Sequence, residues 1–221
     1  MKVGMRKGFS LIEIGIVMVV IGLIIAAVMK GKDVIKGAET KEVAQNFMGK
    51  WVSAADTYYD KMGFNPYGTR AMPMIGATPN TAILMNIPGE TDPDANVTTT
   101  WQAAGIDIRN LIKTDTGNPT NAYIAGEYTE DSEVTVDFAY AEINERMRNV
   151  VIFNDVPVDV AKAFDKLVDS SVDGSTGKVV TDTTTADTVG NTNAAAVTFV
   201  TTAWPDVTEN AVTDVYIILE H

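Results

Sequence analysis

Cysteine is absent from the sequence, and histidine occurs once, as His221 in the last position. Without cysteine the chain can form no disulfide, thiolate nucleophile, Cys-ligated zinc site or iron–sulfur cluster. A histidine in the last position is expected to be frayed, so we expect neither a Ser-His-Asp triad nor a His-rich metal site. The sequence also lacks a glycine-rich phosphate loop and the HExxH and GxSxG motifs. These absences exclude most familiar hydrolase chemistry, and we expect a protein that is not an enzyme.

Basic residues are scarce as well. The 221 residues include 17 Lys and Arg against 29 Asp and Glu, which gives a formal net charge of −12. A surface this acidic repels phosphate backbones, so no nucleic-acid partner is expected. The length leaves room for one ordinary domain and an appendage.

The amino-terminal part of the chain differs from the rest in composition. Residues 1–8 carry Lys2, Arg6 and Lys7 and no acid, and residues 9–29 have only Ser10 and Glu13 as polar side chains. An apolar run of this length matches a bilayer core of about 30 Å. We expect a single membrane-spanning helix over 9–31 with a cytoplasmic amino end. A cleaved secretory signal is the alternative, but this apolar run is too long and lacks a small-residue cleavage site.

The pattern becomes amphipathic over 32–62. Apolar residues recur at steps of three and four, which is typical of one face of a helix packed on an apolar surface. They are Ala44, Phe47, Met48, Trp51, Val52, Ala55, Tyr58, Tyr59 and Met62. The sequence predicts one long helix from about Phe9 to Met62, ended by the Gly- and Pro-containing segment 63–68.

Glu13 does not suit a plain membrane anchor. A lone carboxylate in an apolar span costs on the order of 3 kcal/mol. One explanation is a position close enough to the interface to reach lipid headgroups. The other is a dedicated cationic partner.

The chain begins with a short basic leader that ends at Gly8. The segment FSLIE, with Glu13 fifth after Gly8, and the long apolar helix follow. Together these features resemble the prepilin signature of type IV pilins and of type II secretion pseudopilins. Segments 101–112 and 156–179 also resemble elements of such proteins. Two features depart from the family: Lys30 stands where many pilins have proline, and the C-terminal disulfide of many pilins cannot form.

The resemblance implies a leader, 1–8, that a membrane peptidase removes between Gly8 and Phe9, followed by N-methylation of Phe9. The helix would then form the core of a filament. Glu13 would pair with the new amine of Phe9 on an adjacent subunit; a pair with the amine of its own chain is the rival explanation. Gly15 and Gly22, the latter with Ala26 one turn on, would allow close helix approach.

The implied protein is a structural subunit of a type IV pilus-like filament. Its partners would be copies of itself, the prepilin peptidase and the inner-membrane assembly machinery. It would reside in the bacterial inner membrane before assembly into a surface pilus. A pseudopilin in a periplasmic pseudopilus, and a minor pilin or adhesin, are the alternatives.

Residues 63–221 are expected to form a globular α+β head whose antiparallel sheet packs on the long helix. Alternation and β-branched residues predict strands over 122–128, 133–140, 149–153, 178–181, 196–203 and 212–219. Helices are predicted over 101–112 and from Asp155, as the cap, to about Val168. A low-complexity surface loop is predicted over 181–193.

Asp169 and Asp173 lie in an Asp- and Gly-rich stretch after the last predicted helix. Two alternatives remain for it. A calcium ion could hold the loop through carboxylate and backbone oxygens. Otherwise the stretch is an ordinary turn, in which Asp and Gly satisfy the turn geometry.

Overall fold

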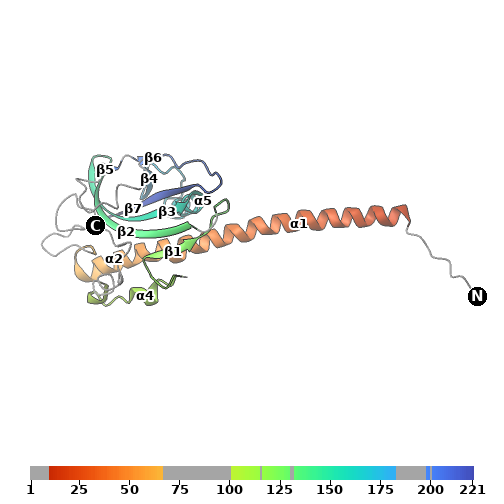
Figure 1. The fold of residues 1–221 in the computed structure, drawn as a ribbon. Coiled ribbons are helices and arrows are strands. Elements are labelled where there is room, and N and C mark those ends of the chain that lie inside the picture. The colour runs from red at the N-terminus through yellow and green to blue at the C-terminus, as the bar shows by residue number, and fades with distance from the viewer. Residues whose placement is uncertain (1–9, 67–100, 115, 130–131, 183–197, 200) are drawn as a thin grey trace, which may run out of the picture. The chain divides into compact units, whose positions relative to one another are not determined.

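The computed structural model describes residues 10–66, 101–114, 116–129, 132–182, 198–199 and 201–221 (Figure 1). The chain divides into two compact units, residues 1–39 and 40–221. The predicted leader and cleavage site, residues 1–8 with Gly8 and Phe9, lie outside the described residues. So do most of the 63–100 segment and nearly all of the predicted 181–193 loop.

Helix α1 spans Leu11–Val43. Its apolar part, Leu11–Gly31, is 21 residues long, and none of it is buried. By length and composition it is the one helix among the described residues that could cross a membrane. The predicted apolar amino-terminal helix is therefore confirmed, whereas its place in a membrane stays a prediction.

A π-helix, η1 (Ala44–Gly49), and helix α2 (Lys50–Met62) follow α1 without a break in the chain. The continuous α-helix predicted through Met62 is thus interrupted by one wider turn, which places the consecutive residues Phe47 and Met48 both in the core. Gly63, with a φ of 75°, ends α2 by donating its N–H to the Tyr59 carbonyl at 2.8 Å.

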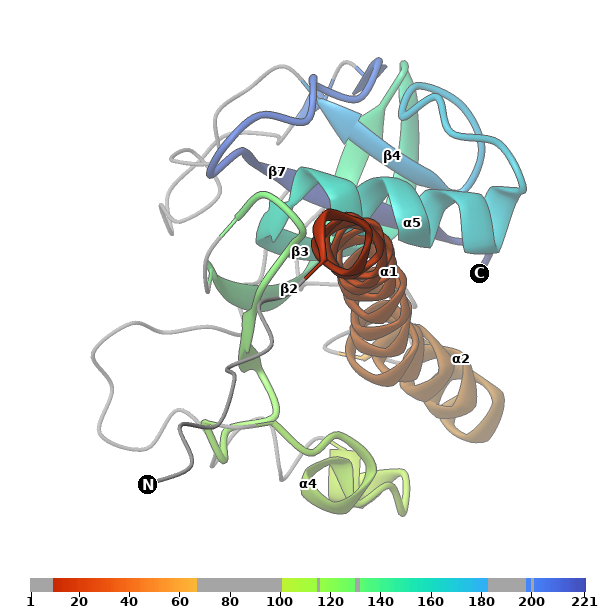
Figure 2. The ribbon, with the colours of Figure 1, turned by 90° about the vertical axis from the view of Figure 1, so that its right-hand side faces the viewer.

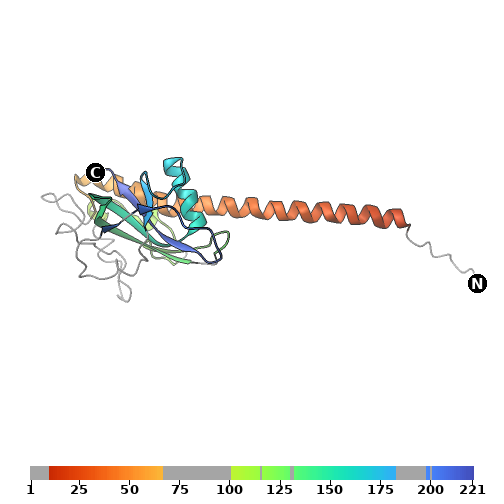
Figure 3. The ribbon, with the colours of Figure 1, turned by 90° about the horizontal axis from the view of Figure 1, so that it is seen from above.

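The strands of residues 40–221 form one sheet with the order β1-β2-β3-β7-β4-β6, in which neighbours are antiparallel. A short seventh strand, β5, pairs parallel with β2. The bounds are β1 Asn121–Ile124, β2 Ser132–Ile143, β3 Arg146–Pro157, β4 Val179–Asp182, β5 Thr198–Phe199, β6 Thr201–Thr202 and β7 Val212–Leu219. The strands lie side by side in Figure 3. The α+β class with an antiparallel sheet is confirmed.

One face of this sheet packs on η1, α2 and helix α5 (Val158–Asp169). Trp51 of α2 contacts Phe138 of β2 edge to face with ring centroids 6.0 Å apart, and Phe47 contacts Phe153 at 5.9 Å. Figure 2 shows α5 crossing this face. A smaller apolar cluster, which includes Ile152 and Tyr216, covers the opposite face.

Strand positions were predicted better than strand lengths. β7 has the predicted bounds, and β4 is displaced by one residue. β2 and β3 are much longer than predicted, because Asn144 and Glu145 form a two-residue turn with positive φ values of 48° and 62° that pairs the strands up to their ends. β1 is shorter than predicted. The single strand predicted over 196–203 is instead two short strands with different partners.

Both predicted helices of the carboxyl-terminal part need correction. Segment 101–112 is not one helix: Gly105 has a φ of 68°, and a new short helix, α4 (Ile108–Leu111), begins after Asp107, whose side chain accepts the Asn110 N–H. Asp155 does not cap α5. It has a φ of 57° in an irregularity of β3, and its N–H bonds to the Asp214 carboxylate because β3 pairs with β7 as far as Pro157.

Candidate functional site

The amino end of α1 is a capping box. The Ser10 backbone N–H donates to Glu13 Oε2 at 2.8 Å, and the Ile12 N–H donates to Ser10 Oγ at 3.3 Å. This reciprocal arrangement satisfies two of the backbone donors that a helix leaves free at its start. The Ser10-x-x-Glu13 spacing ahead of an apolar run is a sequence signal for such a box, and our sequence reasoning missed it. Glu13 therefore has a structural role besides the predicted assembly role.

Glu13 is also the only charged side chain of Leu11–Met29. Among the described residues no ion pair involves it. Its hydrogen bond to Ser10 holds the carboxylate one residue from Phe9, which is the predicted new amino terminus. A cationic amine at Phe9, or on a second copy of the chain, would meet a carboxylate that the helix start already positions.

Apart from Glu13 and Lys30, the surface of Leu11–Gly31 is apolar. Large side chains such as Leu11, Ile12 and Met18 are exposed by 70% or more. Gly15 and Gly22 lie in this helix, and a Cβ placed on either would meet no atom within 4 Å. Both glycines are therefore open to another helix, as close approach requires, although the described residues 10–39 alone supply no such helix.

The carboxylates in the loop after α5 accept hydrogen bonds from nearby backbone N–H and hydroxyl groups of the same chain. Asp169 Oδ2 accepts the N–H groups of Lys178 and Val179, each at 2.9 Å. Asp173 accepts the N–H groups of Ser175 and Thr176 and the Thr176 hydroxyl, at 2.8–2.9 Å. These bonds support the ordinary turn. Among the described residues no group of three or more His, Cys, Asp or Glu side chains could hold a metal ion, and calcium binding stays an untested alternative.

Asp165 connects α5 to this loop and to Trp204. Its Oδ2 accepts the indole N–H of Trp204 at 2.6 Å and the Asp173 N–H at 3.2 Å. The side chain is buried, and burial raises the pKa of this carboxyl above its ordinary value, although the Trp204 hydrogen bond opposes the shift.

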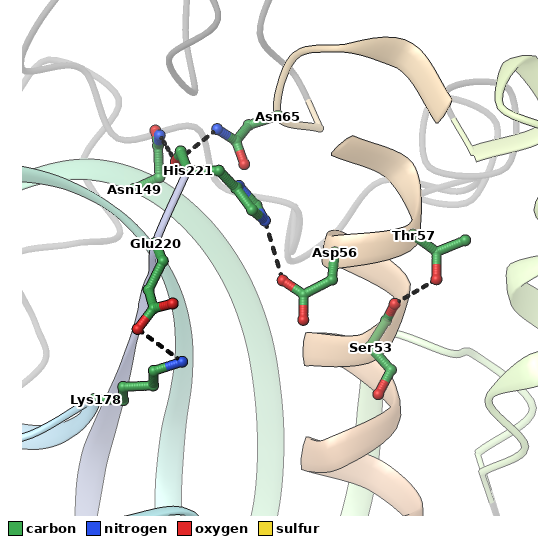
Figure 4. A network of polar contacts seen from close by, with 8 residues as sticks. All are labelled: Ser53, Asp56, Thr57, Asn65, Asn149, Lys178, Glu220 and His221. Carbon is green, nitrogen blue, oxygen red and sulfur yellow. Dashed lines mark hydrogen bonds and ion pairs between the residues drawn. The ribbon is translucent and has the colours of Figure 1, made fainter. Parts of the chain in front are cut away.

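His221 is ordered, contrary to the prediction of a frayed end. Its Nε2 lies 3.0 Å from Asp56 Oδ1 on α2, and its side chain is only 17% exposed. Its backbone carbonyl accepts hydrogen bonds from Asn65 and Asn149 at 3.1 and 2.7 Å (Figure 4). This network ties the end of β7 to α2. No sequence motif indicated it.

An open groove of about 600 Å³ adjoins this network. It lies between α2, the end of α5 and the end of β7. Apolar side chains of α5 and β7 line it, and Lys50, Asp60 and Lys178 are among the charged ones.

Comparison of the chain with protein-family models, with characterised proteins and with solved structures finds no match. The functional argument therefore depends on the residues themselves.

Proposed function

We propose that this chain is a structural subunit of a type IV pilus-like filament, assembled through α1 after cleavage between Gly8 and Phe9. The observation that carries the proposal is the apolar helix Leu11–Gly31, which has no burial within the chain and whose first turn holds the single carboxylate Glu13. Such a surface needs lipid before assembly and other apolar helices after it.

The rest of the proposal follows from this helix. In the membrane the chain is a single-pass protein with a cytoplasmic amino end, and the prepilin peptidase and the assembly machinery act on it there. In the filament, copies of α1 replace lipid around one another, and Gly15 and Gly22 permit close contact. The α+β unit, residues 40–221, then supplies the filament surface. The role is structural rather than catalytic.

Processing gives the first test. Intact-mass spectrometry of the protein from its native membrane should show a chain that begins at N-methylated Phe9. Gly8→Val should leave the precursor uncut, because a Cβ obstructs the close approach that the peptidase needs. Gly4→Val is the matched control and should be cut normally. A native chain that retains Met1, or that starts near Lys30, would overturn the proposal.

Electron microscopy of sheared surface material gives the second test. Long filaments that contain the processed chain support the pilus subunit. Processed chain without surface filaments favours the pseudopilin alternative, in which a short polymer stays in the periplasm.

A further inference from the structure

Lysines follow the apolar part of α1 at its carboxyl end. Lys30, Lys32 and Lys36 are the basic residues of 14–38, and Asp33 is the one acid of that segment. All four positions lie in α1, and Lys30 is exposed. An ion pair with Asp33 would neutralise one lysine and leave two. The segment is therefore positive in a chain of net charge −12. We name Lys30, Lys32 and Lys36 the α1-end lysines.

The rule that orients membrane helices does not account for the α1-end lysines. Basic residues are favoured at the cytoplasmic end of a membrane helix. Lys2, Arg6 and Lys7 mark the amino end of this chain as the cytoplasmic one. The α1-end lysines stand at the opposite end in equal number, so they need another explanation.

The height of the α1-end lysines along the helix matches the layer of lipid headgroups. Leu11–Gly31 has 21 residues, which at about 1.5 Å per residue span a hydrocarbon core of about 30 Å. The headgroup layer adds about 5–7.5 Å on each side. Lys36 is about 7.5 Å beyond Gly31 along the helix, and Glu39, the next acid, is about 12 Å beyond it. The α1-end lysines therefore fall within this layer, and Glu39 falls outside it.

The α1-end lysines are also distributed around the helix. At about 100° per residue, Lys32 and Lys36 are about 40° apart around the axis, whereas Lys30 is at least about 120° from each. A second protein helix packed on one side of α1 would meet only one of these two sides. Lipid headgroups encircle a membrane helix and meet both. Anionic phospholipids therefore fit the arrangement, because their phosphates attract lysine ammonium groups and accept hydrogen bonds from them.

We propose that the α1-end lysines bind the headgroups of anionic phospholipids in the leaflet away from the cytoplasm. This inference rests on the proposed function, in which the chain resides in a membrane before assembly. The contact fixes the depth of α1 in the bilayer and adds an electrostatic anchor to the apolar one. It ends when the chain leaves the membrane for the filament.

Spin-labelled lipids test this contact. The full-length protein is reconstituted in phosphatidylcholine vesicles that contain a trace of spin-labelled phosphatidylglycerol or of spin-labelled phosphatidylcholine. Electron paramagnetic resonance gives the fraction of each label that the protein immobilises. The wild type should immobilise phosphatidylglycerol more than phosphatidylcholine. Lys30→Gln with Lys32→Gln and Lys36→Gln should lower this ratio at least about twofold, and the three matching Arg substitutions should preserve it.

The matched control is Lys61→Gln with Lys113→Gln and Lys166→Gln. It removes the same charge from exposed positions in residues 40–221 and should keep the wild-type ratio. The basic residues of the leader are present in every variant, so they cannot cause a difference between variants.

The outcomes separate this contact from the filament function. A wild type without lipid preference, an unchanged ratio in the variant with glutamine at the α1-end lysines, or an equal fall in the control would overturn the lipid contact and leave the filament function standing. Loss of filaments in that variant with an unchanged lipid ratio would also overturn it, and would show that the lysines act between copies. A wild-type chain that does not insert into the vesicles would overturn both proposals.

Discussion

The imidazole of His221 stacks on the ring of Tyr59, with centroids 4.0 Å apart and planes inclined by 8°. The same imidazole bonds to Asp56, one turn earlier on α2. The last residue of the sequence therefore closes the contact between β7 and the helical layer.

Removing the Tyr59 ring should lower the free energy of unfolding. An aromatic pair contributes about 0.5–1.5 kcal/mol beyond its buried area, so we expect Tyr59→Ala to cost at least about 1 kcal/mol and Tyr59→Phe almost nothing. Urea unfolding of the full chain in detergent measures the difference. Tyr123→Ala, at a half-exposed position of edge strand β1, is the control. Equal loss in both Ala variants would show that the stack has no special role.

The hydrogen bonds to Asp173 in its turn should make the free energy of unfolding depend on pH. The Thr176 N–H, followed by the Thr176 hydroxyl and the Ser175 N–H, holds the pKa of Asp173 below its ordinary value of 3.8. A lowered pKa contributes stability that is present above pH 3.8 and is lost as the pH falls through the folded-state pKa. The melting temperature of Asp173→Ala should therefore lie below that of the wild type at pH 7, and the two should converge in stronger acid. A constant gap at every pH would contradict this account.

The ionisation of Asp165 should have the opposite effect on stability. Burial raises its pKa above 3.8, so its ionisation removes stability as the pH rises from 3.8 through the raised folded-state pKa. Asp165→Asn keeps an acceptor for Trp204 and should abolish this fall. Asp165→Ala leaves the indole N–H without its acceptor and should cost about 1–3 kcal/mol at pH 3, with a smaller cost at pH 7, where the wild type has lost the stability that ionisation removes. Melting curves of both variants between pH 3 and 7 test the assignment, and a fall that persists in the Asn variant would exclude Asp165 as its source.

Local patterns were sufficient where local physics decides the structure. Uniform apolarity predicted the Leu11–Gly31 helix, and periodicity predicted the core face of α2, where Trp51, Ala55 and Tyr58 are buried. The strand β7 was predicted to the residue because its run of β-branched and aromatic residues lies between the polar Glu209–Asn210 turn and Glu220. The Ser10-x-x-Glu13 box and the Asn144–Glu145 turn were readable in the sequence and were overlooked.

The features that the sequence did not predict depend on pairing between segments that are distant in the chain. Asp155 follows a helix-cap pattern, but the β3–β7 ladder keeps it in the sheet. His221 finds its partners Asn149, Asn65 and Asp56 at separations of 72, 156 and 165 residues. No window of sequence contains such a network, so the end of the chain was wrongly predicted to fray.

Calcium should not stabilise the Asp169–Lys178 loop. The carboxylates of Asp169 and Asp173 already accept backbone N–H groups, and a hard cation would have to replace those bonds. We expect no rise in melting temperature and no heat of binding at millimolar calcium. A rise that Asp173→Asn abolishes and Asp56→Asn leaves intact would contradict this expectation and establish the calcium site.

The two roles of Glu13 can be separated by choice of substitution. Glu13→Gln keeps a side-chain acceptor for the Ser10 N–H, because glutamine serves in the third helical position of a capping box as glutamate does. It removes the charge that would pair with the amine of Phe9, a pair that offsets the cost of both charges in lipid. Glu13→Leu removes the acceptor and the charge together. If the charge pair drives assembly, both variants should insert, be cleaved after Gly8 and form no filaments.

Ser10→Ala completes the comparison, since it removes only the hydroxyl that accepts the Ile12 N–H. It should weaken the helix start by about 1 kcal/mol and leave filaments intact. Cleavage is scored by intact mass and filaments by electron microscopy of the sheared fraction. Normal filaments from Glu13→Gln, with loss in Glu13→Leu, would mean that Glu13 acts through the capping box. Normal filaments from both would mean that the carboxylate is only an interfacial polar group, and the charge-pair mechanism would be wrong.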